Sequence, residues 1–146
     1  MEFSGAAYVS PPLYREVGRL GQHAATRAFG MAGVTPTDVD IFSLYDPNSF
    51  EIIRQMEVLG LCAEGEGGAF VSEGHIGLEG KFPTNPDGGC LSYAWNGTQQ
   101  MTLKVVEAVR QLRGTAVNQV LGAELAVAAN AGSGAGHYEL AVLGRV

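Results

Sequence analysis

The chain has 146 residues, of which 46% are hydrophobic and 16% charged, and its formal net charge is −6. This length and composition fit one domain with a real core, so a disordered tail and a disulfide mini-protein are both excluded. A net negative charge does not attract a phosphate backbone, so nucleic acid is disfavoured as a partner. No apolar run approaches the ~18 residues that cross a bilayer, and the first residues lack a secretory signal. Two cysteines do not make the disulfide framework typical of small secreted proteins, so the cytoplasm is the expected compartment.

Hydrophobic periodicity and turn residues predict an α/β layered domain. In chain order we expect a helix at 11–33, a strand at 40–45 and a helix at 46–60. An irregular glycine-rich loop at 63–89, a helix at 97–113 and two strands at 121–130 and 138–146 follow. Gly18 and Gly21 lie inside the first helix, where each costs roughly 1 kcal/mol relative to alanine. That cost suggests that this helix packs closely against another element.

Three patterns that can carry chemistry give weak signals here. The GSGAG segment at 132–136 lacks the following helix of a dinucleotide-binding loop, so a tight connection between two strands is favoured. The histidines, His23, His75 and His137, have no metal-ligand spacing with the cysteines, and no metal site is expected. Cys90, with His75 or His137 as its base, is a candidate nucleophile, although a small buried thiol is the commoner role.

The most informative segment runs from Asn85 to Thr98 and reads NPDGGCLSYAWNGT. Its turn residues, paired glycines and aromatic side chains lead directly into an amphipathic helix. Helix N-termini carry unpaired N–H groups that favour developing negative charge, so a loop at that position is typical of a functional site. A capping loop with a buried tyrosine and tryptophan is the structural alternative.

The chain resembles the C-terminal half of thiolase-superfamily proteins, nearest the sterol-carrier-protein-type branch known as lipid-transfer proteins or acetyl-CoA acetyltransferases. Four segments carry the resemblance in order: AGVTPTDVDIFSLYD, LGLCAEGEGGAFV, NPDGGCLSYAWNGT and GAELAVAANAGSGAG. The resemblance implies a single thiolase C-terminal-like domain over residues 1–146, with a mixed sheet covered by helices. It also implies a coenzyme A thioester as substrate and no bound cofactor.

The chain departs from the degradative thiolases at the residues of their chemistry. Trp95 stands where the family's Gly-His-Pro motif has its general-base histidine. Tyr45 and Asp46 stand where that family has an asparagine or histidine followed by an acid. The family's C-terminal cysteine falls at or near Asn130, and its nucleophilic cysteine belongs to the N-terminal half. Ordinary Claisen chemistry is therefore disfavoured.

One branch of the superfamily is similar in these departures, namely the thiolase-like aldolases of steroid side-chain degradation. Those aldolases cleave a β-hydroxyacyl-CoA and work with a DUF35-type partner, built from a zinc ribbon and an OB-fold. Tyrosines take over the active site in that branch, and the matching candidates here are Tyr45, Tyr93 and the less certainly aligned Tyr138. The resemblance implies retro-aldol cleavage, with Tyr93 as an acid/base residue and Tyr45 as its partner or an oxyanion donor.

This chemistry agrees with those residue types, because retro-aldol cleavage requires no nucleophilic cysteine. Tyrosine acts as a base at neutral pH only if its pKa is lowered from about 10, and helix N-termini after Tyr45 and Tyr93 are expected to help. The structural alternative for each tyrosine is a buried ring with a satisfied hydroxyl. We expect the substrate contacts to come from Asp46, Gly88, Gly89, Trp95, Asn96 and Asn130.

Two alternatives stay open at this point. The chain could be a non-catalytic scaffold that binds an acyl-CoA or a partner, or a degradative acyl-CoA acyltransferase. A natural small subunit and a piece of a longer chain are both compatible with the sequence. An N-terminal thiolase half or an equivalent subunit is an expected partner, and an oligomer is expected because a lone half should expose a large apolar face.

Overall fold

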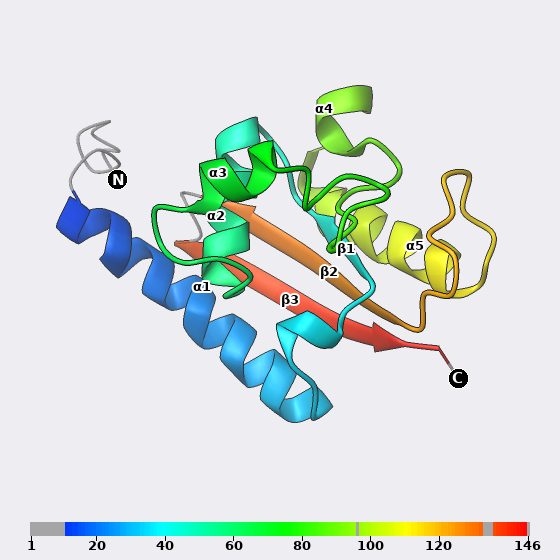
Figure 1. The fold of residues 1–146 in the computed structure, drawn as a ribbon, viewed down its shortest axis with the longest axis horizontal. Coiled ribbons are helices and arrows are strands. Elements are labelled where there is room, and N and C mark those ends of the chain that lie inside the picture. Colours follow the sequence, from blue (N-terminus) through cyan, green and yellow to red (C-terminus); the bar gives the residue numbers. More distant parts are fainter. Residues whose placement is uncertain (1–10, 96, 133–135, 146) are drawn as a thin grey trace.

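The computed structural model describes residues 11–95, 97–132 and 136–145 (Figure 1). Its longer helices are α1 (Pro11–Ala32), α2 (Ser49–Val58) and α5 (Gln100–Leu112), and its strands are β1 (Ile41–Leu44), β2 (Leu125–Gly132) and β3 (His137–Gly144). Shorter pieces complete the order, namely η2 (Pro36–Asp38), α3 (Gly67–Ser72), α4 (Gly89–Tyr93) and η3 (Gly97–Gln99). Among the described residues, none of the helices is long and apolar enough to cross a bilayer.

The three strands form one mixed sheet in the order β1-β2-β3. β1 pairs with β2 in parallel, with Ile41 opposite Ala126, and β2 pairs with β3 antiparallel, with Leu125 opposite Gly144. All four residues of β1 are buried, as is typical of a parallel strand covered on both faces. The mixed sheet covered by helices confirms the α/β class that the sequence predicts.

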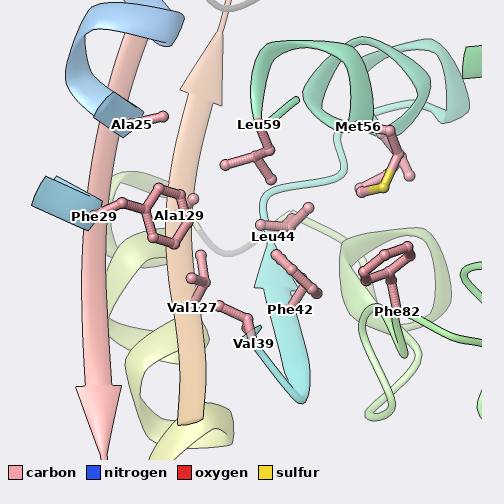
Figure 2. Packing of buried hydrophobic residues seen from close by; sticks show 11 residues of the cluster. Ala25, Phe29, Val39, Phe42, Leu44, Met56, Leu59, Phe82, Val127 and Ala129 are labelled. Atoms are coloured by element: carbon pink, nitrogen blue, oxygen red, sulfur yellow. The ribbon is translucent and has the colours of Figure 1, made fainter. Parts of the chain in front are cut away.

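Alternation along the strands divides the core into two layers. Phe42 and Leu44 of β1 point to the face that α1 and α2 cover, where they pack with Phe29, Met56 and Val127 (Figure 2). On the other face, a second cluster packs α5 against the sheet, and its buried members are Ile41, Ala108, Leu112, Ala123, Ala126 and Ala128. Because both faces are covered, polar side chains gather at the ends of the strands.

Helix α1 packs closely against α2, as the glycines inside it predict. A Cβ atom at Gly18 would overlap the guanidinium of Arg54 from α2. Helix α1 ends at Ala32 and is followed by Gly33, whose φ of +70° suits a glycine. The helical cost of Gly18 is therefore offset by the packing of α1 on α2.

Several expected boundaries are wrong. The strand expected at 121–130 begins only at Leu125 and runs to Gly132. Residues 63–89 are not wholly irregular, because α3 forms where Glu57 Oε1 accepts the N–H groups of Gly65 and Gly67, at 3.0 and 3.2 Å. The second helix begins at Ser49 rather than residue 46, since the Asn48 side chain caps it by accepting the Glu51 N–H at 2.9 Å. The segment 85–98 includes α4, and a 3-10 turn precedes α5. Of the expected turn at 131–136, residues 133–135 lie outside the described residues.

Candidate functional site

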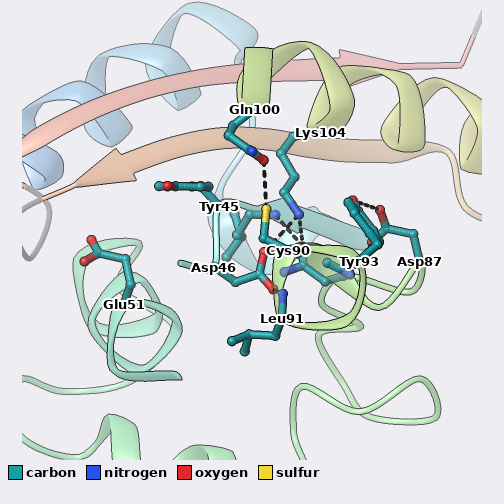
Figure 3. A network of polar contacts seen from close by, with 12 residues as sticks. Tyr45, Asp46, Glu51, Asp87, Cys90, Leu91, Tyr93, Gln100 and Lys104 are labelled. Carbon is teal, nitrogen blue, oxygen red and sulfur yellow. Dashed lines mark hydrogen bonds and ion pairs between the residues drawn. The ribbon is translucent and has the colours of Figure 1, made fainter. Parts of the chain in front are cut away.

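The candidate site lies where β1 ends and the 84–95 segment crosses over it (Figure 3). Ligands of open α/β sheets bind outside the carboxyl ends of the strands, because side chains there are not needed for the core. Asp46 is the second residue after β1, α4 provides Cys90 and Tyr93, and α5 contributes Lys104. These residues are distant in sequence, and the fold brings them together.

Asp46 is the centre of a buried polar network. Its Oδ1 accepts the Cys90 N–H at 2.9 Å and the Lys104 ammonium at 3.1 Å, and its Oδ2 accepts the Leu91 N–H at 3.2 Å. Asp46 is 2% exposed and Lys104 is fully buried. The carboxylate that we expect to contact substrate is thus engaged by donors of the chain itself.

Asn85 extends this network to the end of β1. Its side-chain oxygen accepts the Leu44 N–H at 2.7 Å and lies 3.5 Å from Lys104 Nζ. Gly89 begins α4 with a φ of +64°, and a Cβ atom there would overlap the carboxylate of Asp46. Only glycine therefore fits between the α4 turn and the buried carboxylate.

Tyr93 is held by an acidic neighbour in its own turn. Its hydroxyl donates to Asp87 Oδ2 at 2.7 Å, while Asp87 Oδ1 accepts the Gly89 N–H at 3.0 Å. Burial, and then the hydrogen bond to the Asp87 carboxylate, raise the pKa of Tyr93. The side chain is still 39% exposed, so its hydroxyl is accessible as well as fixed.

The pKa values of the other two candidate tyrosines are raised as well. Burial raises the pKa of Tyr45, and a hydrogen bond with Trp95 offsets part of that effect. Burial likewise raises the pKa of Tyr138, whose buried hydroxyl has no partner among the described residues. The expectation of lowered tyrosine pKa values is therefore wrong, because removal from water outweighs the field of the nearby helix ends.

The proposed Cys90–histidine pairing does not form. Cys90 Sγ donates to Gln100 Oε1 at 2.8 Å, and burial raises the pKa of this thiol. His75 lies 3.1 Å from Glu73 Oε2, and His137 lies 3.6 Å from Glu139 Oε1. Cys90 is therefore a small buried thiol, which was the structural alternative to a nucleophile.

The remaining expected contacts are spread around the same turn. The Gly88 N–H donates to Asn85 O at 2.8 Å, so like that of Gly89 it is occupied within the loop. The Trp95 side chain is 65% exposed, and Asn130 on β2 is partly buried opposite Glu139. Asn96 lies outside the described residues.

A small apolar cavity adjoins the turn. Its volume is about 250 Å³, and its lining includes Ile52, Ile53, Val71, Ile76 and Leu91. Pockets for drug-sized ligands have volumes of about 300 Å³ or more, so this cavity suits an apolar fragment.

Sequence reasoning missed four polar residues of this site, namely Asn85, Asp87, Gln100 and Lys104. Asp87 was visible as the acid of the NPDGG turn, but its six-residue separation from Tyr93 matches no regular spacing. Lys104 lies in an amphipathic helix, where a lysine side chain is ordinarily expected on the solvent-exposed face. Its burial against Asp46, 58 positions away, appears only in the folded chain.

The three-stranded mixed sheet, covered by helices on both faces and crossed by a polar turn at the end of its parallel strand, defines a layered α/β domain. The chain belongs to the thiolase C-terminal domain-like family, whose model matches residues 19–145. This match confirms the resemblance and the fold that the four sequence segments imply.

Proteins similar to this chain include a lyase, an aldolase, sterol carrier proteins and an acetyl-CoA acetyltransferase. The chain is 36% identical over 129 residues to the 17-hydroxy-3-oxo-4-pregnene-20-carboxyl-CoA lyase of Mycobacterium tuberculosis, covering 84% of this chain and 31% of that protein. It is 36% identical over 108 residues to a steroid side-chain-cleaving aldolase of Thermomonospora curvata, covering 71% and 25%. It is 37% identical over 116 residues to sterol carrier protein 2 of Oryctolagus cuniculus, covering 79% and 21%.

A solved structure gives the same relationship in three dimensions. The Ltp2-ChsH2(DUF35) aldolase superposes with a TM-score of 0.73 at 32% identity, covering 90% of this chain and 32% of that one. The chain thus spans between about a fifth and a third of the length of these relatives.

Proposed function

We propose that the chain is the C-terminal part of a thiolase-like C–C lyase that cleaves a β-hydroxyacyl-CoA by a retro-aldol reaction. The observation that carries the proposal is the Tyr93–Asp87 hydrogen bond, 2.7 Å long, in a fixed and accessible turn. The names of the lyase and aldolase relatives support the reaction class. The raised pKa values of the three tyrosines favour proton donation over nucleophilic chemistry.

The first step removes the proton of the β-hydroxyl group. Tyr93 stays protonated at neutral pH, so it acts as a base only by passing its own proton on. As the substrate proton moves to Tyr93 Oη, the phenol proton moves along the existing hydrogen bond to Asp87 Oδ2. The carboxylate is the final acceptor, and no free phenolate forms.

The second step breaks the Cα–Cβ bond. The bonding electron pair moves to the thioester carbonyl and leaves a thioester enolate, while Cβ becomes the carbon of a ketone or aldehyde. Tyr45, whose pKa is raised by burial, is the proposed donor to the enolate oxygen or to Cα. Transfer of one proton to Cα gives the shortened acyl-CoA, and exchange with solvent then restores both side chains.

The acyl group is proposed to be of the steroid side-chain type, and the assembly to include a DUF35-type protein and an N-terminal thiolase half. Support comes from the names of the similar lyase, aldolase and complex. The exposed Leu91, Tyr93 and Trp95 side chains around α4, at 60%, 39% and 65%, support a site that a second domain or subunit completes. Asn96 and Asn130 are proposed substrate contacts because of the family resemblance.

The test is an assembly assay. The chain is mixed with an N-terminal thiolase half and a DUF35-type partner and supplied with a branched β-hydroxyacyl-CoA, and the carbonyl product and shortened acyl-CoA are measured by mass spectrometry. We expect equal amounts of both products, only in mixtures that contain this chain. Tight association of the components without either product, at any pH from 6 to 9, would instead support the scaffold role.

A further inference from the structure

We infer that Asp46 and Lys104 form a buried positioning pair that fixes the α4 turn, and with it the Tyr93 hydroxyl, against the end of β1. Asp46 is adjacent to Tyr45, and its carboxylate accepts the amides of Cys90 and Leu91, at 2.9 and 3.2 Å. One carboxylate therefore links both tyrosine-bearing segments. The inference rests on the proposed function only for its effect on turnover.

Besides Asp46, Cys90 anchors the turn, because its buried thiol donates to Gln100 Oε1 of α5 at 2.8 Å. Helix α4 has only five residues, and its side chains at Leu91 and Tyr93 are exposed rather than packed in the core. Residue 94, which follows it, adopts a φ of +72°, so no regular helix continues the turn. Hydrogen bonds from the backbone to Asp46 therefore supply much of the restraint on this segment.

Lys104 provides the second anchor. Its ammonium lies 3.1 Å from Asp46 Oδ1 and 3.5 Å from Asn85 Oδ1, and its side chain is fully buried. A buried ion pair seldom adds stability over a well-packed apolar pair, because desolvation offsets the attraction. The pair instead fixes the orientation of the Asp46 carboxylate, because it holds the two oxygens where the two amides of α4 can donate to them.

The sharpest variant is Asp46→Asn, because it keeps the shape of the side chain. An amide group offers one acceptor oxygen instead of two and carries no charge for Lys104. Its matched control is Asp40→Asn. Asp40 Oδ2 accepts the amides of Glu124 and Leu125, both at 2.9 Å, beside the opposite end of β1. Both substitutions remove the charge of a carboxylate that accepts two backbone amides, and only Asp46→Asn touches α4 and takes away one of the two acceptor oxygens in use.

The first readout is hydrogen exchange in the isolated full chain, which needs no activity. We expect Asp46→Asn to speed exchange in residues 88–95 at least tenfold with residues 123–126 unchanged, and Asp40→Asn to leave exchange in residues 88–95 unchanged. Unchanged exchange at Cys90 and Leu91 in Asp46→Asn would overturn the inference. So would equal acceleration throughout the chain, because it would mean a loss of global stability.

The second readout is steady-state kinetics of the assembled complex. Misplacing an acid/base group lowers kcat more than it weakens substrate binding. We expect Asp46→Asn to lower kcat at least tenfold with KM within threefold, and Asp40→Asn to leave both within threefold. Local exchange in α4 with an unchanged kcat would overturn the positioning role. If the unaltered assembly releases no product, the proposed function fails, whereas the exchange experiment still decides whether Asp46 holds the turn.

A third variant separates the charge of the pair from its hydrogen bonds. Lys104→Met keeps an unbranched side chain and leaves the Asp46 carboxylate with its two amide donors. We expect exchange in residues 88–95 to rise less than in Asp46→Asn, and adding Lys104→Met to Asp46→Asn to recover stability but not kcat. Recovery of kcat in the double variant would show that the unpaired lysine charge, and not the lost position of the turn, caused the defect.

Discussion

The Tyr93 hydroxyl donates a 2.7 Å hydrogen bond to Asp87 Oδ2, and the two residues begin and end the turn that crosses the carboxyl end of β1. This hydrogen bond raises the pKa of the phenol and places a carboxylate where the proposed relay needs a proton acceptor. The same carboxylate receives the Gly89 amide through its other oxygen, at 3.0 Å, so its orientation is fixed. The dyad therefore depends on backbone geometry as well as on residue type.

Tyr93→Phe removes only the hydroxyl and should abolish most turnover. Loss of a positioned acid/base group costs about 10²- to 10⁴-fold in rate, and we expect kcat of the assembled lyase to fall within that range. Thermal unfolding of the variant should stay close to that of the unaltered chain, since the side chain is 39% exposed. Turnover that survives within a few-fold would remove Tyr93 from the mechanism.

Asp87→Asn should lower the pKa of Tyr93 while reducing turnover. The carboxylate raises this pKa, so its neutral replacement moves the phenol titration to lower pH, with burial still holding it above the ordinary value. The measurement is the absorbance change of phenolate formation between pH 9 and 12. Asp38→Asn is the control, because Asp38 bonds only with Thr35 in an exposed turn. An unchanged titration in Asp87→Asn would contradict the dyad.

Tyr138→Phe should leave turnover within a few-fold and increase stability at alkaline pH. The buried hydroxyl has no partner among the described residues, so its removal should cost less than about 1 kcal/mol at neutral pH. Burial raises the pKa of Tyr138 above its ordinary 10.0, so folding opposes ionisation of the phenol. Stability of the unaltered chain should therefore fall as pH rises above about 10, where the unfolded phenol ionises. Urea unfolding at pH 7 and pH 10.5 measures both effects; a large loss of turnover would return Tyr138 to the site.

Gly89→Ala should destabilise the chain far more than Gly114→Ala. Both glycines have a positive φ, +64° and +70°, but an added Cβ overlaps the Asp46 carboxylate only at Gly89 and meets open space at Gly114. The left-handed conformation alone costs about 1–2 kcal/mol, and the overlap should raise the loss at Gly89 above about 3 kcal/mol. Urea denaturation of the two variants gives the comparison. Equal losses would mean that the α4 turn moves away from Asp46 at little cost.

Both thiols should react slowly with iodoacetamide in the folded chain. Burial raises the pKa of Cys62 to about 11, and burial also raises that of Cys90. Because the thiolate is the reactive form, alkylation of Cys62 should speed up about tenfold per pH unit between pH 7 and 10. Cys62→Ser isolates the Cys90 reaction, and unfolding in urea provides the fast reference. Rapid labelling of Cys90 at pH 7 would reopen its role as a nucleophile.

Local patterns in the sequence predicted the helices and strands with the strongest periodicity. The apolar spacing at 11–33 anticipated α1, and the short apolar run at 40–45 anticipated β1. Gly18 signalled close packing before its neighbour Arg54 was known. The short helices α3 and α4 were missed because each is too brief for a repeating pattern, and α3 depends on Glu57, which lies eight to ten residues earlier in the chain.

By itself, the sequence determined the family, the α/β class and the segment that bears the candidate site, because periodicity, turn residues and family motifs are properties of contiguous residues. Only the tertiary structure decided which partners Asp46 and Tyr93 have and in which direction the tyrosine pKa values shift. Burial makes Asp46 the partner of Lys104 and of the α4 amides, and burial also raises the pKa values on which the tyrosines' roles depend. Desolvation and the pairing of distant charges arise only when the chain packs, so no local pattern encodes them.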